Sequence, residues 1–398
     1  MKRLAMLASS SLFLVVAGCP APQPIDPPLG EGEGEGEGEG ENPGEGEGEG
    51  EGEGEGEGEG EGEGETFPSC AVSGTGAVTF TRDEGATLAT TTPLTGTVYT
   101  YGLAALGNGV LVAEHAGEFL RSRDHGCTWT VIGDAPTSPM RMASGGGRVY
   151  AWADNYRELA RIDDDDTITV LDPPGIGELK GAHVHSDGRL TIALGATLVS
   201  STDQGATFDR GTTPAFTGDD AGLVYRAWFS GKDGDHVVFG AASVGARVSF
   251  DGGVTWTAST GFADDGRANV FEGVFSPIDE DIVWAVGLNI AESLATPNNS
   301  KHIYRSTDGG LTFAPIVDES ADVVIVNGPM MAASARDADV FYFVFGTYFQ
   351  GYGTDLYRVT GDGAVTRTHN TNHDISALVF APDDDATLYL GLVHEEIN

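Results

Sequence analysis

Short runs of apolar or alternating apolar and polar residues recur throughout residues 66–398. Runs of this length and pattern, bounded by Gly, Pro, Asn and Asp, predict half-buried or central β-strands. One set of four covers residues 270–275, 282–287, 302–305 and 312–316. The connection between the first two strands of this set is also repeated, because FSPIDEDIVWAVG from Phe275 matches FAPDDDATLYLGL from Phe380. The pattern therefore predicts an all-β domain built from repeats.

A shorter motif marks the same repeats. Four segments read Ser-x-Asp-x-Gly-x-Thr followed by Trp or Phe: Ser122–Trp129, Ser201–Phe208, Ser249–Trp256 and Ser306–Phe313. Three weaker copies occur where the spacing requires them: Thr81–Leu88, Arg161–Ile168 and Thr360–Arg367. Successive copies start about 40 to 57 residues apart, which is the length of a four-stranded propeller blade.

The motif resembles the Asp box, or BNR repeat, of sialidase-like, sortilin-like and photosystem-assembly-factor-like propellers. The resemblance implies that each copy is the turn between the third and fourth strands of a blade. In such a turn the Asp carboxylate accepts local hydrogen bonds, and Gly supplies a positive φ. It assigns a structural role to seven aspartates: Asp83, Asp124, Asp163, Asp203, Asp251, Asp308 and Asp362.

The two ends of this region are complementary halves of one blade. Residues 375–392 read as its first two strands, and residues 77–91 read as its third and fourth strands. Joining them closes the ring and leaves no open sheet edge. Seven motifs then correspond to seven blades, so residues 67–398 are predicted to form a single seven-bladed β-propeller.

The N-terminal segment has a different character. Residues 1–19 combine Lys2 and Arg3 with a short apolar region and end in Val-Ala-Gly-Cys, which resembles a bacterial lipoprotein signal peptide. Cys19 is then the lipid attachment site. Residues 20–28 are rich in Pro, and residues 31–65 are Glu-Gly repeats without apolar side chains to bury, so residues 20–66 are predicted to be a disordered tether. We expect a lipid-anchored protein of the cell envelope, at the outer membrane or cell surface of a Gram-negative bacterium.

Charge narrows the possible partners. The formal net charge is −40. Residues 31–65 contribute −17, and the signal peptide together with Asp26 contributes +1, which leaves −24 for residues 66–398. This charge argues against nucleic acid, whose phosphates require Lys and Arg. The sequence predicts a monomer that contacts the membrane through its lipid and binds a glycan or a protein.

Two cysteines remain after Cys19 is assigned to the lipid. Cys70 and Cys127 form an even pair in an exported protein, where disulfides persist. They are a candidate disulfide that would fasten the N-terminal strands near the point where the ring closes.

Candidate ligand positions lie in the long connections between second and third strands. Tyr348, Phe349 and Tyr352 fall in one of these connections and could stack on sugars or contact a protein. His369, His373 and Asp374 could in principle bind a metal, and residues 163–166 superficially resemble a calcium loop, but neither set has the required spacing. No metal and no cofactor is expected.

The resemblance to these families is limited to the repeats and does not include the residues of an active site. The Arg-Ile-Pro motif of sialidases is missing, because Arg161-Ile162 continues into Asp163. No catalytic residue is therefore assigned, and a non-catalytic binding or assembly propeller is favoured. A glycoside hydrolase, sialidase-like or xyloglucanase-like, is the alternative. It would use a pair of the carboxylates that we expect to be reachable, namely Glu114, Glu118, Glu272 and Asp355.

Overall fold

The computed structural model describes residues 78–89, 98–154, 156–175, 177–210, 213–296, 300–347, 353–370 and 374–394. The chain divides into two compact units, residues 1–62 and residues 63–398, and every described residue belongs to the second. Cys19 and the whole of the predicted tether therefore lie outside the described residues. No helix among the described residues is long and apolar enough to cross a membrane.

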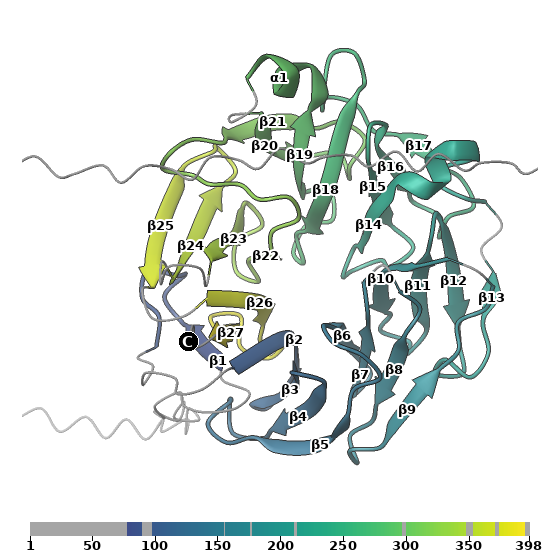
Figure 1. Ribbon diagram of the computed structural model, residues 1–398, viewed down its shortest axis with the longest axis vertical. Helices are drawn as coiled ribbons and strands as arrows, with labels where there is room; N and C mark the ends of the chain where they lie inside the picture. Colours follow the sequence, from purple (N-terminus) through teal and green to yellow (C-terminus); the bar gives the residue numbers. More distant parts are fainter. Residues whose placement is uncertain are drawn as a thin grey trace, which may run out of the picture. The chain divides into compact units, whose positions relative to one another are not determined.

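Seven antiparallel blades surround a central axis (Figure 1). Six of them are contiguous in sequence. Blade 1 comprises β2 (Val98–Gly107), β3 (Val110–His115), β4 (Glu118–Ser122) and β5 (Thr130–Asp134). Blade 2 comprises β6 (Arg141–Gly145), β7 (Arg148–Trp152), β8 (Leu159–Ile162) and β9 (Ile168–Leu171). Blade 3 comprises β10 (Leu179–Val184), β11 (Leu190–Leu194), β12 (Thr197–Ser201) and β13 (Asp209–Arg210).

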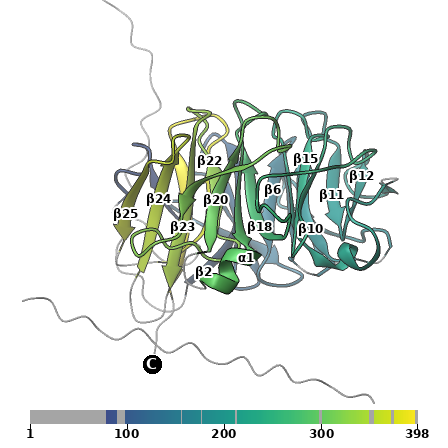
Figure 2. The same ribbon diagram turned by 90° about the horizontal axis from the view of Figure 1, so that it is seen from above.

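The next three blades follow the same order. Blade 4 comprises β14 (Val224–Phe229), β15 (Val237–Ala241), β16 (Gly245–Ser249) and β17 (Thr257–Ala258). Blade 5 comprises β18 (Ala268–Phe275), β19 (Val283–Asn289), β20 (Lys301–Ser306) and β21 (Ala314–Asp318). Blade 6 comprises β22 (Met331–Ala333), β23 (Val340–Thr347), β24 (Gly353–Thr360) and β25 (Val365–Asn370). Two short helices, η1 (Gly218–Leu223) and α1 (Ile290–Ala295), lie in connections, and the edge view places α1 at one rim of the ring (Figure 2).

The closing blade joins the two ends of the propeller. β26 (Asp374–Phe380) pairs with β27 (Leu388–His394), and β1 (Val78–Thr81) pairs with the other edge of β27 in a register that runs from Val78 opposite Gly391 to Thr81 opposite Leu388. The Ala89 amide then donates to the Phe80 carbonyl at 2.8 Å, and the residues predicted for the fourth strand after it lie largely outside the described ranges. The seven-bladed ring and its closure by both termini, as predicted from the repeats, are confirmed.

Apolar side chains fill the space between neighbouring blades. Between blades 5 and 6, for example, Trp284 of β19 lies against Phe341 of β23 with ring centroids 5.2 Å apart. Both side chains are fully buried. Central strands are covered on both faces, which explains why their sequences read as continuous apolar runs rather than as an alternation.

The turns between third and fourth strands share one hydrogen-bond pattern. Asp251 accepts from the Ser249 hydroxyl at 2.8 Å, and from the amide and hydroxyl of Thr255 at 2.8 and 2.6 Å. The Gly253 amide, at φ +85°, donates to the Ser249 hydroxyl at 2.8 Å. The same set of bonds recurs at Asp124, Asp203 and Asp308, and at Asp83 with Thr81 in place of Ser. Hydrogen bonds from Thr207 and Ser201 lower the pKa of Asp203 to about 2.

The two most divergent motifs use other contacts. Asp163 pairs with the guanidinium groups of Arg148 and Arg161, at 2.8 and 2.9 Å. The Thr167 amide of the same turn donates to Asp165 instead, at 3.0 Å. Asp362 accepts from the Thr360 hydroxyl and from a backbone amide. Each turn therefore supplies an acceptor for local donors even where the motif is degenerate.

Candidate functional site

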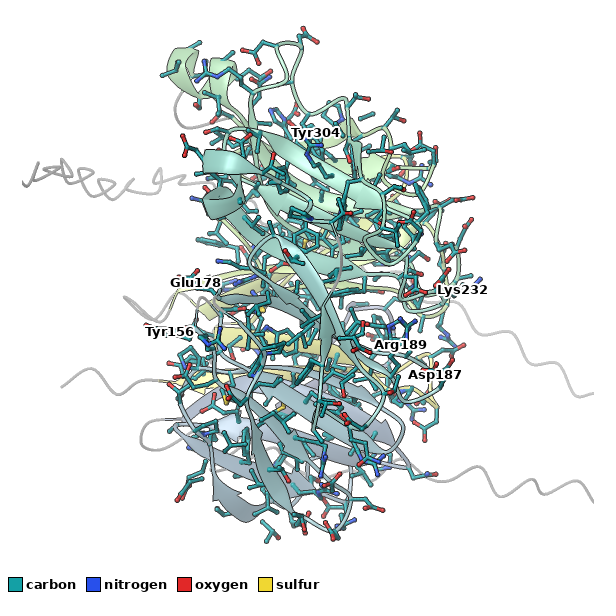
Figure 3. All side chains as sticks on the ribbon, turned by 90° about the vertical axis from the view of Figure 1, so that its right-hand side faces the viewer. Tyr156, Glu178, Asp187, Arg189, Lys232 and Tyr304 are labelled. Atoms are coloured by element: carbon teal, nitrogen blue, oxygen red, sulfur yellow. The ribbon has the colours of Figure 1, made fainter. Side chains whose placement is uncertain are left out.

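The ring presents two faces with different connections. The links from second to third strands and from fourth to first strands form one face, here called the loop face. The hairpins between first and second strands share the opposite face with the aspartate turns. Figure 3 shows Tyr156 and Glu178 projecting from the loop face, and Asp187, Arg189 and Lys232 from the other.

Two adjoining cavities open along the axis from the loop face. The outer one, the rim cavity, has a volume of about 500 Å³, and its lining includes Tyr156, Pro329 and Ile375. The inner one, the axial cavity, has a volume of about 200 Å³, and its lining includes Trp152 and Glu272. Three residues line both cavities: Tyr101, Arg141 and Met330. We refer to the two cavities together as the axial site.

Irregularities in the innermost strands place several of these side chains. The register between β2 and β3 shifts between Thr100 and Gly102, so Tyr101 occupies a β-bulge. Similar shifts precede Arg226 in β14 and Glu272 in β18. A bulge bends the strand and redirects the side chains beside it, and here it accompanies the side chains that meet on the axis.

Two arginines and two carboxylates form a single cluster in the axial site. Asp154 lies 2.5 Å from both Arg141 and Arg226, measured between the nearest side-chain nitrogen and oxygen. Glu272 lies 3.0 Å from Arg141 and 3.4 Å from Arg226 by the same measure. Burial opposes the charge on Arg141, but Glu272 and Asp154 outweigh this effect and raise its pKa. Burial and the neighbouring Arg141 lower the pKa of Arg226. Two positive and two negative charges leave the cluster neutral.

Three buried polar atoms of lining residues have no hydrogen-bond partner among the described residues: Nε1 of Trp152, Oδ1 of Asp154 and Oε2 of Glu272. Of these, Oε2 of Glu272 makes the ion pairs with Arg141 and Arg226. Leaving a buried donor or acceptor unpaired costs roughly 1–3 kcal/mol. Trp152 and Asp154 therefore each hold one polar atom without a hydrogen bond or an ion pair among the described residues, a donor in the first case and an acceptor in the second.

Asp374 lies beside the rim cavity, next to Ile375 in β26, and is 8% exposed. Burial raises its pKa to about 6, and a hydrogen bond with Thr354 only partly offsets this. Its oxygen Oδ1 has no partner among the described residues. The folded protein therefore favours the protonated carboxyl, and the stability that this gives is complete below about pH 4 and is lost as the pH rises through 6.

We expect Asp374→Asn to remove this pH dependence. The amide carries no charge at any pH, so the variant should match the wild type at pH 4 and exceed its free energy of unfolding by roughly 2–3 kcal/mol at pH 8. Urea unfolding at both pH values measures the difference. A difference that is equal at pH 4 and pH 8 would contradict the assignment.

The residues predicted from the sequence fall into three groups. The seven turn aspartates lie on the face opposite the axial site. Tyr348, Phe349 and Tyr352 lie outside the described residues, as do His373 and Cys70. Cys127 is disulfide-bonded, and its predicted pairing with Cys70 stays a prediction. No group of three or more His, Cys, Asp or Glu within the described ranges is placed to hold a metal ion.

The expectation that four carboxylates are reachable is wrong for two of them. Glu114 and Asp355 are each 0% exposed. Glu114 accepts hydrogen bonds from the backbone amides of Gly117 and Met140, at 2.8 and 3.2 Å, and therefore fastens the segment that leads into the rim cavity. Asp355 contacts His369 at 2.7 Å. Both residues lie in strands that neighbouring blades cover on two faces. In such strands the sequence does not show whether a side chain points into the core or into a cavity.

Sequence reasoning also missed the arginines of the axial site. Arg141, Arg226 and Glu272 come from three blades and carry no local motif, so only ring closure brings them together. A charged residue in an otherwise apolar innermost strand could have indicated this site, because all three residues lie at or within such strands.

Comparisons with known proteins place the chain among its relatives. No family model matches it. The dispase autolysis-inducing protein of Streptomyces mobaraensis is 43% identical over 354 residues, which cover 83% of this chain and 90% of that protein. The chain belongs to the family of the dispase autolysis-inducing protein. The relationship spans nearly the whole of the Streptomyces protein, so the two share the propeller and not only a repeat.

Solved structures share the fold at much lower identity. A GH74 enzyme of Niastella koreensis is 14% identical with a TM-score of 0.53, covering 74% of this chain and 51% of the enzyme. YCF48 bound to D1 peptide is 13% identical with a TM-score of 0.52, covering 75% of this chain and 95% of YCF48. A catalytically inactive virginiamycin B lyase from Staphylococcus aureus with quinupristin is 12% identical with a TM-score of 0.51, covering 73% and 94%. This set contains both enzymes and a peptide-bound protein, so the fold alone does not decide between catalysis and binding.

Proposed function

We propose that this chain is a non-catalytic binding propeller whose axial site holds a segment of a protein partner, and that the partner is a protease. The observation that carries the proposal is the axial site itself, a cavity of about 500 Å³ that narrows to about 200 Å³ on the axis of a rigid ring. Concave, mainly apolar sites with a few fixed polar groups are the usual form of a binding site.

The charged groups of the site support binding over catalysis. Glu272 and Asp154 both contact the same two guanidinium groups. Glycoside hydrolysis needs one carboxyl that donates a proton and a second that acts as nucleophile or base. Carboxylates that are each paired with the same two arginines instead form a fixed, neutral part of the lining of the axial site. The GH74 enzyme shares only the fold with this chain, and a shared fold does not imply that this chain hydrolyses glycosides.

The name of the Streptomyces relative gives the class of partner. That protein is called a dispase autolysis-inducing protein, and autolysis is the self-digestion of a protease. A propeller that binds one segment of a protease molecule can leave another segment of that molecule accessible, and a second protease molecule can then cleave it. YCF48, a propeller with the same fold, is bound to a peptide in its solved structure.

Dispase itself tests this proposal. Added to dispase, the chain should accelerate the appearance of dispase fragments on denaturing gels and should bind dispase in calorimetry. Tyr156, which is 64% exposed, lines the rim cavity, so Tyr156→Glu should weaken binding about tenfold or more. Val170 is 65% exposed on the outer strand β9, and Val170→Glu is the matched control that should bind normally. Absence of both binding and accelerated autolysis would overturn the proposal.

We further propose that Cys19 carries a lipid that anchors the propeller to the cell envelope. The small residues before Cys19, the short apolar region and the Glu-Gly tether support this. Cys19→Ala should abolish incorporation of labelled palmitate and shift the protein from the membrane fraction to the soluble fraction. Unchanged membrane partitioning of the variant would contradict the anchor.

A further inference from the structure

The methionines of this chain are concentrated in one place. The sequence contains six, of which Met1 and Met6 belong to the predicted signal peptide. All four others line the axial site: Met140 in the rim cavity, Met142 and Met331 in the axial cavity, and Met330 in both. Met140 also belongs to the buried core between blades 1 and 2, where it is 1% exposed.

The four side chains come from two sides of the ring. Met140 and Met142 precede and begin β6, whereas Met330 and Met331 precede and begin β22. β6 and β22 lie on opposite sides of the axis (Figure 1). Methionine is unbranched, polarisable and flexible, so it adapts to ligands of different shape and is frequent at adaptable binding surfaces. Two methionines facing two others across a cavity make an adjustable apolar socket.

The polar atoms of the socket match a peptide backbone. Trp152 lines the axial cavity and is 7% exposed, and its buried indole N–H has no hydrogen-bond partner among the described residues. Oδ1 of Asp154, which lines the rim cavity, is an unpaired acceptor. A peptide group offers one carbonyl acceptor and one N–H donor. The neutral arginine–carboxylate cluster leaves no net charge inside the socket to attract a charged side chain.

The surroundings of the socket are strongly acidic. Apart from Asp154, whose charge is balanced within the cluster, the described connections of the loop face contain two arginines, Arg157 and Arg267, and ten acidic residues: Glu158, Asp172, Glu178, Asp219, Asp220, Asp264, Asp265, Glu292, Glu319 and Asp322. Glu178 and Glu319 are paired with Lys180 and Lys301. Complementary charge steers a partner toward such a face and suppresses acidic competitors. A segment that binds here is therefore favoured when it carries Lys or Arg.

From these observations we propose that the axial site binds an extended peptide segment through one bulky apolar side chain, such as Leu, Met or Phe, flanked by basic residues. The apolar side chain enters the methionine socket, the backbone bonds to Trp152 and Asp154, and the basic flanks face the acidic loops. The inference rests on the proposed function in that the peptide segment belongs to the protein partner.

Methionine methyl NMR tests the socket directly. In the full chain labelled with [methyl-¹³C]methionine, four of the six signals report on the axial site, and Met330→Leu assigns the central one. The probes are N-acetylated, amidated pentapeptides with Leu or Ser between pairs of lysines, and the Leu peptide with glutamates in place of the lysines. The Leu–Lys peptide should shift the Met330 and Met331 signals saturably, with at least about tenfold weaker binding for the Ser peptide. The Glu peptide should also bind more weakly.

Variants distinguish a loss of peptide binding at the methionine socket from a general loss of folding. Met330→Glu should abolish the shifts of the remaining methionine signals at an unchanged melting temperature, whereas Met330→Leu should retain them. Leu294 is 79% exposed in α1 on the loop face, does not line either cavity, and Leu294→Glu should behave as wild type. Equal binding of the Leu and Ser peptides, or no saturable shift, would overturn the socket. If dispase still binds in that case, the proposed function survives; if dispase also fails to bind, both fail.

Discussion

Deletion of residues 375–398 is expected to unfold the propeller. This segment supplies nearly all of β26 and the whole of β27, and β27 pairs with β26, β1 and β2. Leu388, Leu390 and Leu392 are at most 1% exposed, and they pack with residues of blade 6. Their loss would expose apolar surface on both flanking blades and leave β1 without its partner. Because a domain is stable by only about 5–15 kcal/mol, losing two strands exceeds that margin.

Circular dichroism and limited proteolysis of the purified variants measure this effect. The truncated chain should show no cooperative melting transition, should aggregate, and should be digested at protease concentrations that the wild type resists. The matched control is deletion of residues 31–65, which contain no apolar side chain and should leave the transition unchanged. A truncated chain that melts at the wild-type temperature would refute closure by the C-terminal strands.

Loss of one arginine from the axial cluster should be the next largest effect. Arg141→Met leaves Asp154 and Glu272 to share Arg226, and the Glu272 side chain is only 9% exposed. Removing one partner of a buried ionic group typically costs about 3–5 kcal/mol, because a charge stays buried without compensation. The single variant should therefore lose roughly 3 kcal/mol in urea unfolding.

The second substitution distinguishes a charge effect from a packing effect. Adding Asp154→Asn to Arg141→Met leaves one guanidinium with one carboxylate, so the double variant should recover to within about 1 kcal/mol of wild type. The Arg123 side chain is 59% exposed beside Asp166, and Arg123→Met should change stability by about 0.5 kcal/mol or less. A double variant that is less stable than the single variant would show that packing, not charge balance, governs the cluster.

The repeats made the fold predictable because each blade has to satisfy the same turn. Ser249, Asp251 and Gly253 form a closed set of local hydrogen bonds that depends on their spacing alone, so the pattern is visible in the sequence. The axial site lacks this property. Arg141 and Glu272 lie in blades 2 and 5 and become neighbours only when the ring closes. The burial of Glu114 was also hidden, since a strand covered on both faces has no exposed side to indicate orientation.

The sharing of one blade between both ends of the chain also ties the site to the order of synthesis. Ile375 and Ser376 line the rim cavity, and they are made only after all six contiguous blades. β1 is made first and has to wait for β27 through the production of six blades. A prematurely terminated chain thus lacks a wall of its own binding site. Partner binding consequently reports that synthesis has passed the strands that close the ring.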